Sequence, residues 1–353
     1  MYMEKGLKEF GHLEHLMIIN PYDMKKEDYS VYLSGRGKGQ DKEEWLFDSF
    51  LLFNTLSSGN DSIADINIGN TMSGEGNFYA VPSPNPANKS DFLETIDSFI
   101  KGCKVMSDEI EKITLKIGEP EFKRNVVVTI PYPGINQCKF GKVNGKELNF
   151  SILGQNLTEA TEDRLTACKW FVDEFLGRWE KENIKNINLL GFYWIFESVY
   201  RGWDVDDHWL LKELHSYVNQ KNKKMFWIPF WSSYNVHLLD NYRDYYFDAA
   251  FVQPNYMFYE NIEDVKEGAD AAKKRNAGFE MEYFLPSEEP TQIKTNRKER
   301  FRVYLNGGVK YGYMNAACAW FIGGGFHTMP NRNEEIEYYY DIIDFVKGRY
   351  RIK

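Results

Sequence analysis

The stretch NLLGFYWIFES, residues 188–198, is apolar along almost its whole length and carries one acidic side chain, Glu197, near its end. Such near-continuous hydrophobicity is typical of a strand that is buried on both faces of a parallel sheet. Side chains alternate along a strand, so the smaller residues from Gly191 to Glu197 share one face, and three large rings share the other: Phe192, Trp194 and Phe196. The smaller face suits the inside of a closed barrel, which would direct Glu197 inward.

A second stretch, AGFEMEYF at residues 277–284, repeats this arrangement with two acidic residues. Gly278, Glu280 and Glu282 fall on one face, and the other face carries the side chains that would pack on surrounding helices, Phe279, Met281 and Tyr283. The sequence therefore predicts two carboxylates directed at the barrel axis from one strand.

About eight apolar or aromatic runs alternate with stretches of helical spacing, as expected of β-α units. The runs are His15–Tyr22, Phe47–Asn54, Asn125–Pro131, Asn188–Glu197, Lys224–Trp231, Phe247–Tyr256, Ala277–Phe284 and Ala316–Gly323. Helical patterns cover Thr158–Glu180, Asp206–Gln220, Ile262–Lys274 and Asn333–Lys347, and another begins near Ser90 or Asp91. We predict an α/β fold, a single (β/α)8 TIM-type barrel over residues 1–353, with a doubly wound open sheet as the alternative.

Two segments interrupt the alternation. Lys25–Glu44 is rich in Gly, Lys and Asp, so we expect the first crossover to be largely loop. A long loop insertion around residues 55–90 is dense in Gly, Ser, Asn and Pro, and loops of this length often shape a site.

Composition narrows the classes of partner. The 353 residues include 43 basic and 52 acidic side chains, a net charge of −9, so no global positive field exists to hold nucleic acid or an anionic membrane. The first residues lack a basic region followed by an apolar run, and no 18 consecutive residues are apolar. We expect a soluble protein, cytoplasmic unless a signal peptide was removed, and the sequence leaves the oligomeric state open.

Cysteine and histidine patterns give no sign of a metal site or a cofactor. The four cysteines form no CxxC pair, and the six histidines form neither HExxH nor a strand HxH. Residues 204–207 resemble part of a calcium loop but lack its Gly and final Glu, so helix capping is the preferred interpretation. We expect no metal and no cofactor.

The three inward glutamates are the candidate catalytic residues. A glutamate is rarely buried without a partner, so Glu197, Glu280 and Glu282 require catalysis, metal binding or an ion pair with arginine. Active sites of barrels lie at the carboxyl ends of the strands, which favours catalysis here. Hydrolysis of a glycosidic bond uses two carboxyl groups, one as acid and one as nucleophile or base.

Aromatic and amide side chains cluster near the same strand ends. Rings of Trp and Tyr stack on the apolar faces of sugars, and amides hydrogen-bond to hydroxyls, although rings also suit a core. The predicted substrate-binding residues are Asn20, Tyr132, Tyr193, Trp203, Asp206, Trp227, Trp231, Gln253, Asn255, Tyr256 and Trp320.

Four motifs in order, GFYWIFESV, FWIPFW, FVQPNYMF and GFEMEYF, resemble the bacterial domain-of-unknown-function family 4855 over nearly the whole chain. That resemblance implies a barrel-like bacterial protein without an established activity. More distantly, the glutamates at the ends of strands four and seven resemble those of the clan A retaining glycosidases. This implies that Glu197 is the acid/base and Glu282 the nucleophile, with Tyr256 near the nucleophile and Trp320 beneath the sugar. Glu280 stays an alternative nucleophile.

The leading hypothesis is a hydrolase that cleaves glycosidic bonds of an oligo- or polysaccharide, with retention favoured over inversion. A non-catalytic carbohydrate-binding barrel is the second hypothesis. The third is a metal-dependent hydrolase that uses Glu280, Glu282, Asp206 or Asp207.

Overall fold

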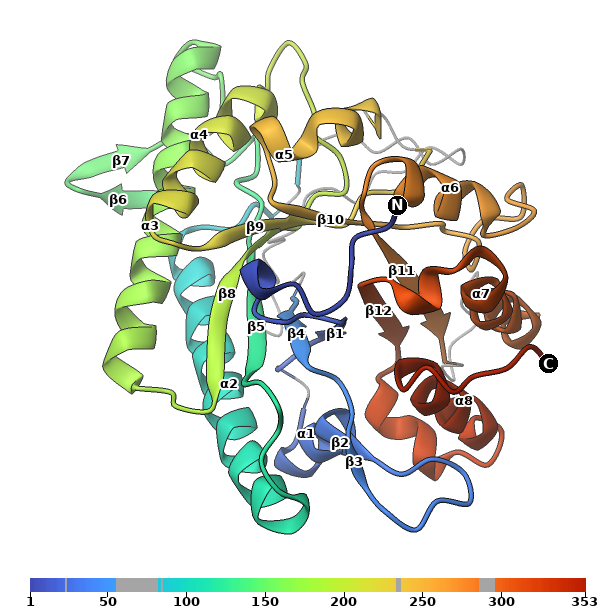
Figure 1. The fold of residues 1–353 in the computed structure, drawn as a ribbon. Coiled ribbons are helices and arrows are strands. Elements are labelled where there is room, and N and C mark those ends of the chain that lie inside the picture. Colours follow the sequence, from blue (N-terminus) through green and yellow to red (C-terminus); the bar gives the residue numbers. More distant parts are fainter. Residues whose placement is uncertain (23, 55–81, 84, 233–235, 286–295) are drawn as a thin grey trace.

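The computed structural model describes residues 1–353 apart from 23, 55–81, 84, 233–235 and 286–295. Eight parallel strands of the described residues close into a barrel in the order β1-β12-β11-β10-β9-β8-β5-β4 (Figure 1). Their bounds are β1 (His15–Ile19), β4 (Ser49–Leu52), β5 (Arg124–Ile130), β8 (Ile187–Trp194), β9 (Lys224–Trp227), β10 (Ala249–Val252), β11 (Gly278–Phe284) and β12 (Cys318–Gly323). Because β1 pairs with both β4 and β12, the sheet is closed. The barrel prediction is confirmed, and the open sheet is excluded.

Helices surround the barrel, and each of the eight predicted apolar runs coincides with one barrel strand, although β5 and β8 begin one residue before their runs. The helices are α1 (Lys26–Leu33), α2 (Lys89–Ile117), α3 (Leu157–Glu182), α4 (Asp207–Gln220), α5 (Tyr242–Tyr245), α6 (Lys266–Lys274), α7 (Arg297–Tyr311) and α8 (Ile336–Val346). The predicted helices are confirmed, with ends shifted by a few residues. Asparagine caps fix two starts: Asn88 accepts a hydrogen bond from the Ser90 N–H at 2.8 Å, and Asn156 accepts one from Glu159 at 2.9 Å.

Shorter elements lie before the first barrel strand and in the connections between the barrel strands and helices. Two hairpins consist of β2 (Ser34–Gly35) with β3 (Glu44–Trp45) and of β6 (Gly141–Val143) with β7 (Lys146–Leu148). Short 3₁₀ helices of the described residues are η1 (Lys8–Phe10), η2 (Val236–Asn241), η3 (Tyr313–Asn315) and η4 (Phe326–Asn331). Most of the insertion predicted around residues 55–90 lies outside the described residues, and its last part leads into α2.

The first crossover differs from the prediction, because it contains the helix α1 and the hairpin β2-β3. Three side chains of α1 are buried, Tyr29, Tyr32 and Leu33, and α1 packs beside α2. Asp28 caps the helix start by accepting a hydrogen bond from the Lys25 N–H at 2.7 Å. Tertiary burial of three apolar side chains thus outweighs the weak helical pattern of this segment.

The strand register decides which side chains enter the barrel. Pairs that lie level on the inner face are Tyr193 with Thr129, Glu280 with Ala319, and Glu282 with Phe321. On the outer face, Tyr283 stacks on Phe301 of α7, with ring centroids 4.4 Å apart. A Cβ atom at Gly191 would lie 2.0 Å from the Lys224 carbonyl oxygen, so the approach of β8 to β9 requires glycine there.

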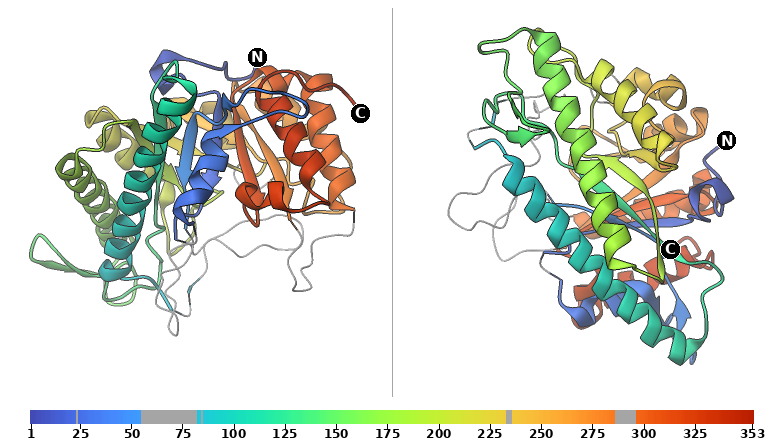
Figure 2. Two further views of the ribbon diagram at one scale, coloured as in Figure 1. Left: turned by 90° about the horizontal axis from the view of Figure 1, so that it is seen from below. Right: turned by 90° about the vertical axis from the view of Figure 1, so that its left-hand side faces the viewer.

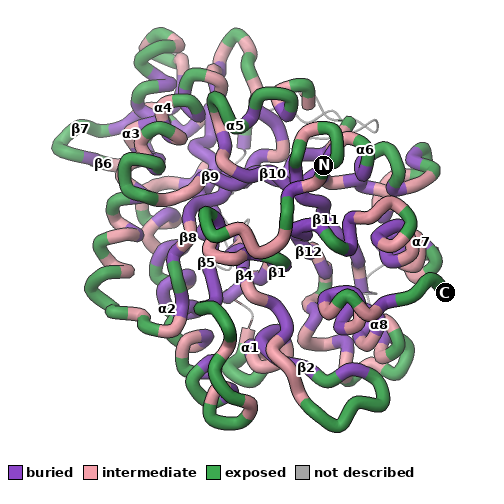
Figure 3. Tube along the Cα trace, viewed as in Figure 1, coloured by how far each residue is buried: buried purple, intermediate pink, exposed green. Residues whose placement is uncertain are grey.

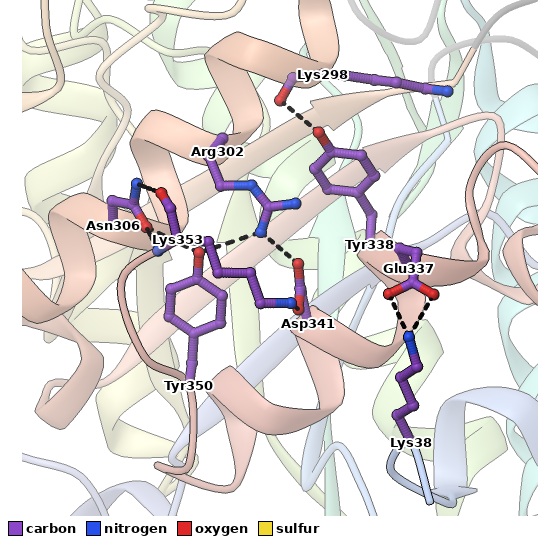
Figure 4. Close-up of polar contacts among 9 residues, drawn as sticks. All are labelled: Lys38, Lys298, Arg302, Asn306, Glu337, Tyr338, Asp341, Tyr350 and Lys353. Carbon is purple, nitrogen blue, oxygen red and sulfur yellow. Dashed lines mark hydrogen bonds and ion pairs between the residues drawn. The ribbon is translucent and has the colours of Figure 1, made fainter.

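The buried residues concentrate in the strands and on the inward sides of the helices (Figure 3). The long helices α2 and α3 lie beside each other, and both chain termini lie at one end of the barrel (Figure 2). A polar network ties the last residues to α7 and α8 (Figure 4). In it, Arg302 and Lys353 both pair with Asp341, and the Tyr350 hydroxyl donates to Asn306 at 2.8 Å.

Candidate active site

The barrel interior brings the three predicted glutamates together. Glu280 and Glu282 lie on the inner face of β11 and are 2% and 1% exposed. Glu197 lies three residues beyond the end of β8 and is half-buried, with its Oε2 atom enclosed. The charges of Glu197 and Glu282 both raise the pKa of Glu280, so the three carboxyls are electrostatic neighbours.

Glu282 is held by two hydrogen-bond donors that converge on one oxygen. Its Oε2 atom accepts a bond from the Asn255 N–H at 2.7 Å and another from the Tyr304 hydroxyl. The Tyr304 oxygen itself accepts the Met257 N–H at 3.1 Å, so its own hydrogen is directed to the carboxylate. Donors of this kind favour the charged form of a carboxyl.

Glu197 and Glu280 have fewer polar partners. Burial raises the pKa of each, and hydrogen bonding by the Gln253 side chain opposes that rise in both. Among the described residues, Glu197 Oε2 and Glu280 Oε2 have no hydrogen-bond partner. Glu197 is therefore placed to hold a proton and to transfer it to a group that enters the site.

Burial dominates the pKa values of the cluster. It raises the pKa of Glu197 to about 7, against the opposing bond from Gln253. It raises the pKa of Glu282 to about 8, although Tyr304 and Asn255 oppose the rise. For Glu280, burial and the two neighbouring charges both raise the pKa far above its ordinary value. The three groups therefore share protons near neutral pH.

None of the three glutamates forms an ion pair with a lysine or arginine within the described part of the chain. A Glu–Arg pair that closes the barrel, the structural alternative to catalysis, is therefore absent from the described residues. The described residues also contain no group of three or more His, Cys, Asp or Glu side chains placed to hold a metal ion.

Several predicted binding residues lie on or just after the barrel strands, and some of them adjoin the carboxyls. Tyr193 is buried on the inner face of β8, and the charges of Glu197 and Glu280 contribute to its raised pKa. Gln253 and Asn255 follow β10, where the Asn255 N–H donates to Glu282 and the Asn255 amide donates to Gln253. Asn20 follows β1, where its Oδ1 atom accepts the Tyr22 N–H at 3.1 Å.

The predicted aromatic residues at the rim differ in exposure. Trp203, in the loop after β8, is 79% exposed. Trp231 is half-buried and donates its indole N–H to the Pro254 carbonyl at 3.1 Å. Tyr256 is half-buried beneath the Arg300 guanidinium, 4.6 Å from its ring centroid.

Three predicted aromatic ligands instead belong to the core. Trp227 stacks on Phe247 at 4.9 Å, outside the strand wall. Trp320 lies level with Met281 on the outer face and meets Phe345 of α8, since the residues that face Glu280 and Glu282 are its neighbours in β12. Tyr132 is also buried, in a cluster described next. All three leave the set of candidate binding residues.

The acidic residues that begin α4 have structural partners. Asp207 is buried, receives the Tyr132 hydroxyl at 2.8 Å and pairs with Arg164 at 2.7 Å. Asp206 caps α4 by accepting the Trp209 N–H at 3.1 Å and lies 3.5 Å from Arg201. The capping interpretation of this segment is confirmed, and Asp206 makes no contact with the glutamates.

Two tyrosines of the site were not predicted. Tyr259 lies near the carboxyls, because burial and the charges of Glu197 and Glu282 raise its pKa to about 12. Because Tyr259 directly follows the FVQPNYMF motif, its position in the sequence could have indicated that it belongs to the site. Tyr304 lies on α7, away from any strand end, and nothing in its local sequence indicates that it reaches Glu282.

Comparison with models of known protein families shows the family to which the chain belongs. The model of the family described as Domain of unknown function (DUF4855) matches residues 18–341. The chain belongs to the DUF4855 family. No curated protein is similar enough to this DUF4855 chain to count as a relative.

Solved structures similar to this DUF4855 protein are distant. A tryptophan synthase alpha-subunit mutant from Pyrococcus furiosus has 10% identity and a TM-score of 0.41, covering 98% of this chain and 99% of that one. An intracellular xylanase mutant from Thermoanaerobacterium saccharolyticum, complexed with xylotetraose, has 9% identity and a TM-score of 0.43, covering 91% and 89%. A GH18 chitinase from Flavobacterium johnsoniae has 10% identity and a TM-score of 0.44, covering 99% and 96%.

These values assign no activity to the DUF4855 chain, and the barrel stands on its own strand pairing. Within the described ranges, none of the helices is apolar over a length sufficient to span a bilayer.

Proposed function

We propose that this chain is a glycoside hydrolase in which Glu197 is the general acid/base and Glu282 the nucleophile. The observation that carries the proposal is the contrast between these two inward carboxyls. Glu282 accepts two donors at one oxygen, whereas Glu197 has an enclosed oxygen without a partner in the described residues. Paired carboxyls in different environments divide the acid and nucleophile roles in this way.

The proposed chemistry follows from these environments. Protonated Glu197 donates its proton to the glycosidic oxygen while ionised Glu282 attacks the anomeric carbon and forms a glycosyl-enzyme. Glu197 then takes a proton from water, which attacks the same carbon and releases Glu282. Trp203, Trp231, Tyr256 and the amide of Asn20 are the proposed contacts to the sugar, and no cofactor takes part in these steps.

The pKa values set the expected pH dependence. The reacting form needs a proton on Glu197, whose pKa is raised to about 7, and a charge on Glu282, whose pKa is raised to about 8. Because Glu282 has the higher of the two pKa values, a single shared proton lies mainly on Glu282, and the reacting form is the less populated of the two singly protonated forms. Activity should therefore follow a bell with its maximum between these two pKa values, and both limbs belong to the coupled cluster.

Isosteric substitutions test the two roles. Glu197→Gln should lower kcat about 10²–10⁴-fold on substrates with a poor leaving group and much less on activated aryl glycosides, because a good leaving group needs no proton. Glu282→Gln should abolish turnover of both substrate types while substrate binding persists. Both variants are assayed on a panel of oligosaccharides and aryl glycosides, with binding followed by calorimetry.

Glu263→Gln is the matched control, because Glu263 is exposed and follows the same β10 strand end. It should behave as the unsubstituted protein. Turnover that survives in Glu282→Gln would refute the nucleophile assignment. Binding of sugars without any turnover by the unsubstituted protein would instead identify a carbohydrate-binding barrel.

A further inference from the structure

We propose that Asn255 is a positioning residue that connects the two reacting carboxyls, holding Glu282 with its main chain and orienting Gln253 toward Glu197 with its side chain. The catalytic role of Asn255 rests on the proposed function, whereas its hydrogen bonds to Glu282 and Gln253 do not depend on it. It goes beyond a role for Asn255 in contacting a sugar, because the backbone N–H and one side-chain N–H of Asn255 are already engaged within the protein.

The backbone conformation of Asn255 makes this double contact possible. Its φ angle is 55°, in the left-handed region that asparagine tolerates better than most residues, and the residue is 6% exposed. In this conformation the N–H reaches Glu282 Oε2 at 2.7 Å, and the side-chain amide reaches back to Gln253 Oε1 at 2.9 Å.

The second contact fixes which end of the Gln253 amide faces the carboxyls. The Asn255 amide nitrogen can only donate, so it holds the Gln253 oxygen on its own side. Val252 lies level with Phe279, so the next residues along the two strands, Gln253 and Glu280, are neighbours. The Gln253 NH₂ group is then the end directed at the carboxyls, where its hydrogen bonding lowers the pKa of both Glu280 and Glu197. If the amide turned over, its oxygen would face two carboxyls and repel their charged forms.

The other titratable groups that face the carboxyls lie on separate elements. They are Tyr193 on β8, Tyr259 after β10 and Tyr304 on α7. Burial and the glutamate charges raise the pKa of each of these tyrosines, so they remain neutral across the range in which the carboxyls titrate. A change in a titration curve within that pH range therefore comes from the glutamates and their amide partners, and not from the tyrosines.

The experiment measures carboxyl titration directly in protein labelled with ¹³C at the glutamate side chains. Resonances are assigned with Glu197→Gln, Glu280→Gln and Glu282→Gln, and spectra are recorded between pH 4 and pH 10. Asn255→Gly keeps the left-handed backbone and its N–H but removes the side-chain donor. It should raise the pKa of Glu197 by about half a unit to one unit, the equivalent of one hydrogen bond, and leave that of Glu282 in place.

Gln253→Met removes the bridging amide itself and should produce the same rise at Glu197. The control is Asn222→Gly, because Asn222 has a similar φ of 56° in an exposed turn after α4. Its glutamate titrations should match those of the unsubstituted protein.

An unchanged Glu197 titration in either Asn255→Gly or Gln253→Met overturns the inference. The Gln253→Met result decides it if Asn255→Gly does not fold. The pH profile of glycoside hydrolysis, recorded in parallel, separates the two proposals. Shifted titrations in a protein without turnover refute only the proposed function, whereas turnover with unshifted titrations and an unchanged pH profile refutes only the role of Asn255.

Discussion

Glu280, like Glu197, has few polar partners among the described residues. Its Oε2 atom has no partner in the described residues, and Gln253 is the one donor that opposes the rise of its pKa. Burial and the charges of Glu282 and Glu197 raise that pKa well above the ordinary 4.5. The folded protein therefore binds more protons than the unfolded chain above pH 4.5, and its stability must fall as the pH rises through this window.

Replacing Glu280 by Gln should weaken that dependence. Glutamine has the shape of the protonated carboxyl and cannot ionise, so the substitution removes the cost of keeping a proton or burying a charge there. A group protonated only in the folded state changes the free energy of unfolding by about 1.4 kcal/mol per pH unit. Glu280→Gln should thus be more stable than the unsubstituted protein at pH 8 and differ little near pH 4.5.

Urea unfolding between pH 4.5 and pH 9 measures this difference. The residual slope in Glu280→Gln comes from Glu197 and Glu282, whose pKa values are also raised. The exposed variant Glu263→Gln should keep the full slope. Equal slopes for Glu280→Gln and the unsubstituted protein would show that Glu280 is charged at neutral pH in the folded state.

At the scale of elements, a buried polar cluster joins α3, α4 and the residues that follow β5. Arg164 on α3 donates to Asp207 at 2.7 Å and to the Pro133 carbonyl at 2.9 Å, while Tyr132 donates to Asp207 at 2.8 Å. Asp207 is the first residue of α4. The cluster therefore anchors the end of the loop that carries Glu197.

Removal of one charge from this cluster should be severe. Arg164→Met keeps most of the side-chain volume but leaves Asp207 buried without its cation, which should cost about 3–5 kcal/mol of unfolding free energy. Arg178→Met on the same helix is the control, because Arg178 pairs with Asp97 and Glu174 near the surface and such pairs contribute about 1 kcal/mol or less. Urea unfolding distinguishes the two, and equal losses would contradict the assigned role of Arg164.

Strand faces could be predicted from the sequence, whereas contacts between elements could not. Alternation along GFYWIFE and GFEMEYF predicted the inward glutamates, because a two-residue period is a local property of the chain. The same rule applied to β12 would have placed Trp320 outside, since Ala319 and Phe321 lie level with Glu280 and Glu282. Tyr304 could not be predicted, because its contact with Glu282 depends on how α7 packs against β11. Helix α1 was missed because its stability comes from burial against α2.

At the scale of the whole molecule, the barrel wall separates two buried polar systems. The glutamates occupy the inner face, whereas His15 and Trp320 lie on the outer face where β1 and β12 close the barrel beneath α8. The Trp320 indole N–H donates to His15 Nδ1 at 3.1 Å. Burial, followed by the charges of Lys5 and Lys347, lowers the pKa of His15 well below 6.5.

The two systems affect stability with opposite signs. Because the folded pKa of His15 is lowered, the unfolded chain binds more protons below pH 6.5, and stability is lost as the pH falls through that range. The raised pKa values of the glutamates have the opposite effect, because they lower the free energy of unfolding as the pH rises. Trp320→Phe should leave the buried His15 Nδ1 atom without its donor and cost about 1–3 kcal/mol at neutral pH.

Trp320→Phe also tests the separation itself. A ring on the outer face should not alter the inner carboxyls, so the ¹³C titrations of Glu197 and Glu282 should match those of the unsubstituted protein. The acid loss of stability should become shallower, because His15 Nδ1 is then free to bind a proton. A shift in the Glu282 titration would instead place the Trp320 ring beside the carboxyls, where the resemblance to retaining glycosidases would put it, and would contradict the outer-face assignment.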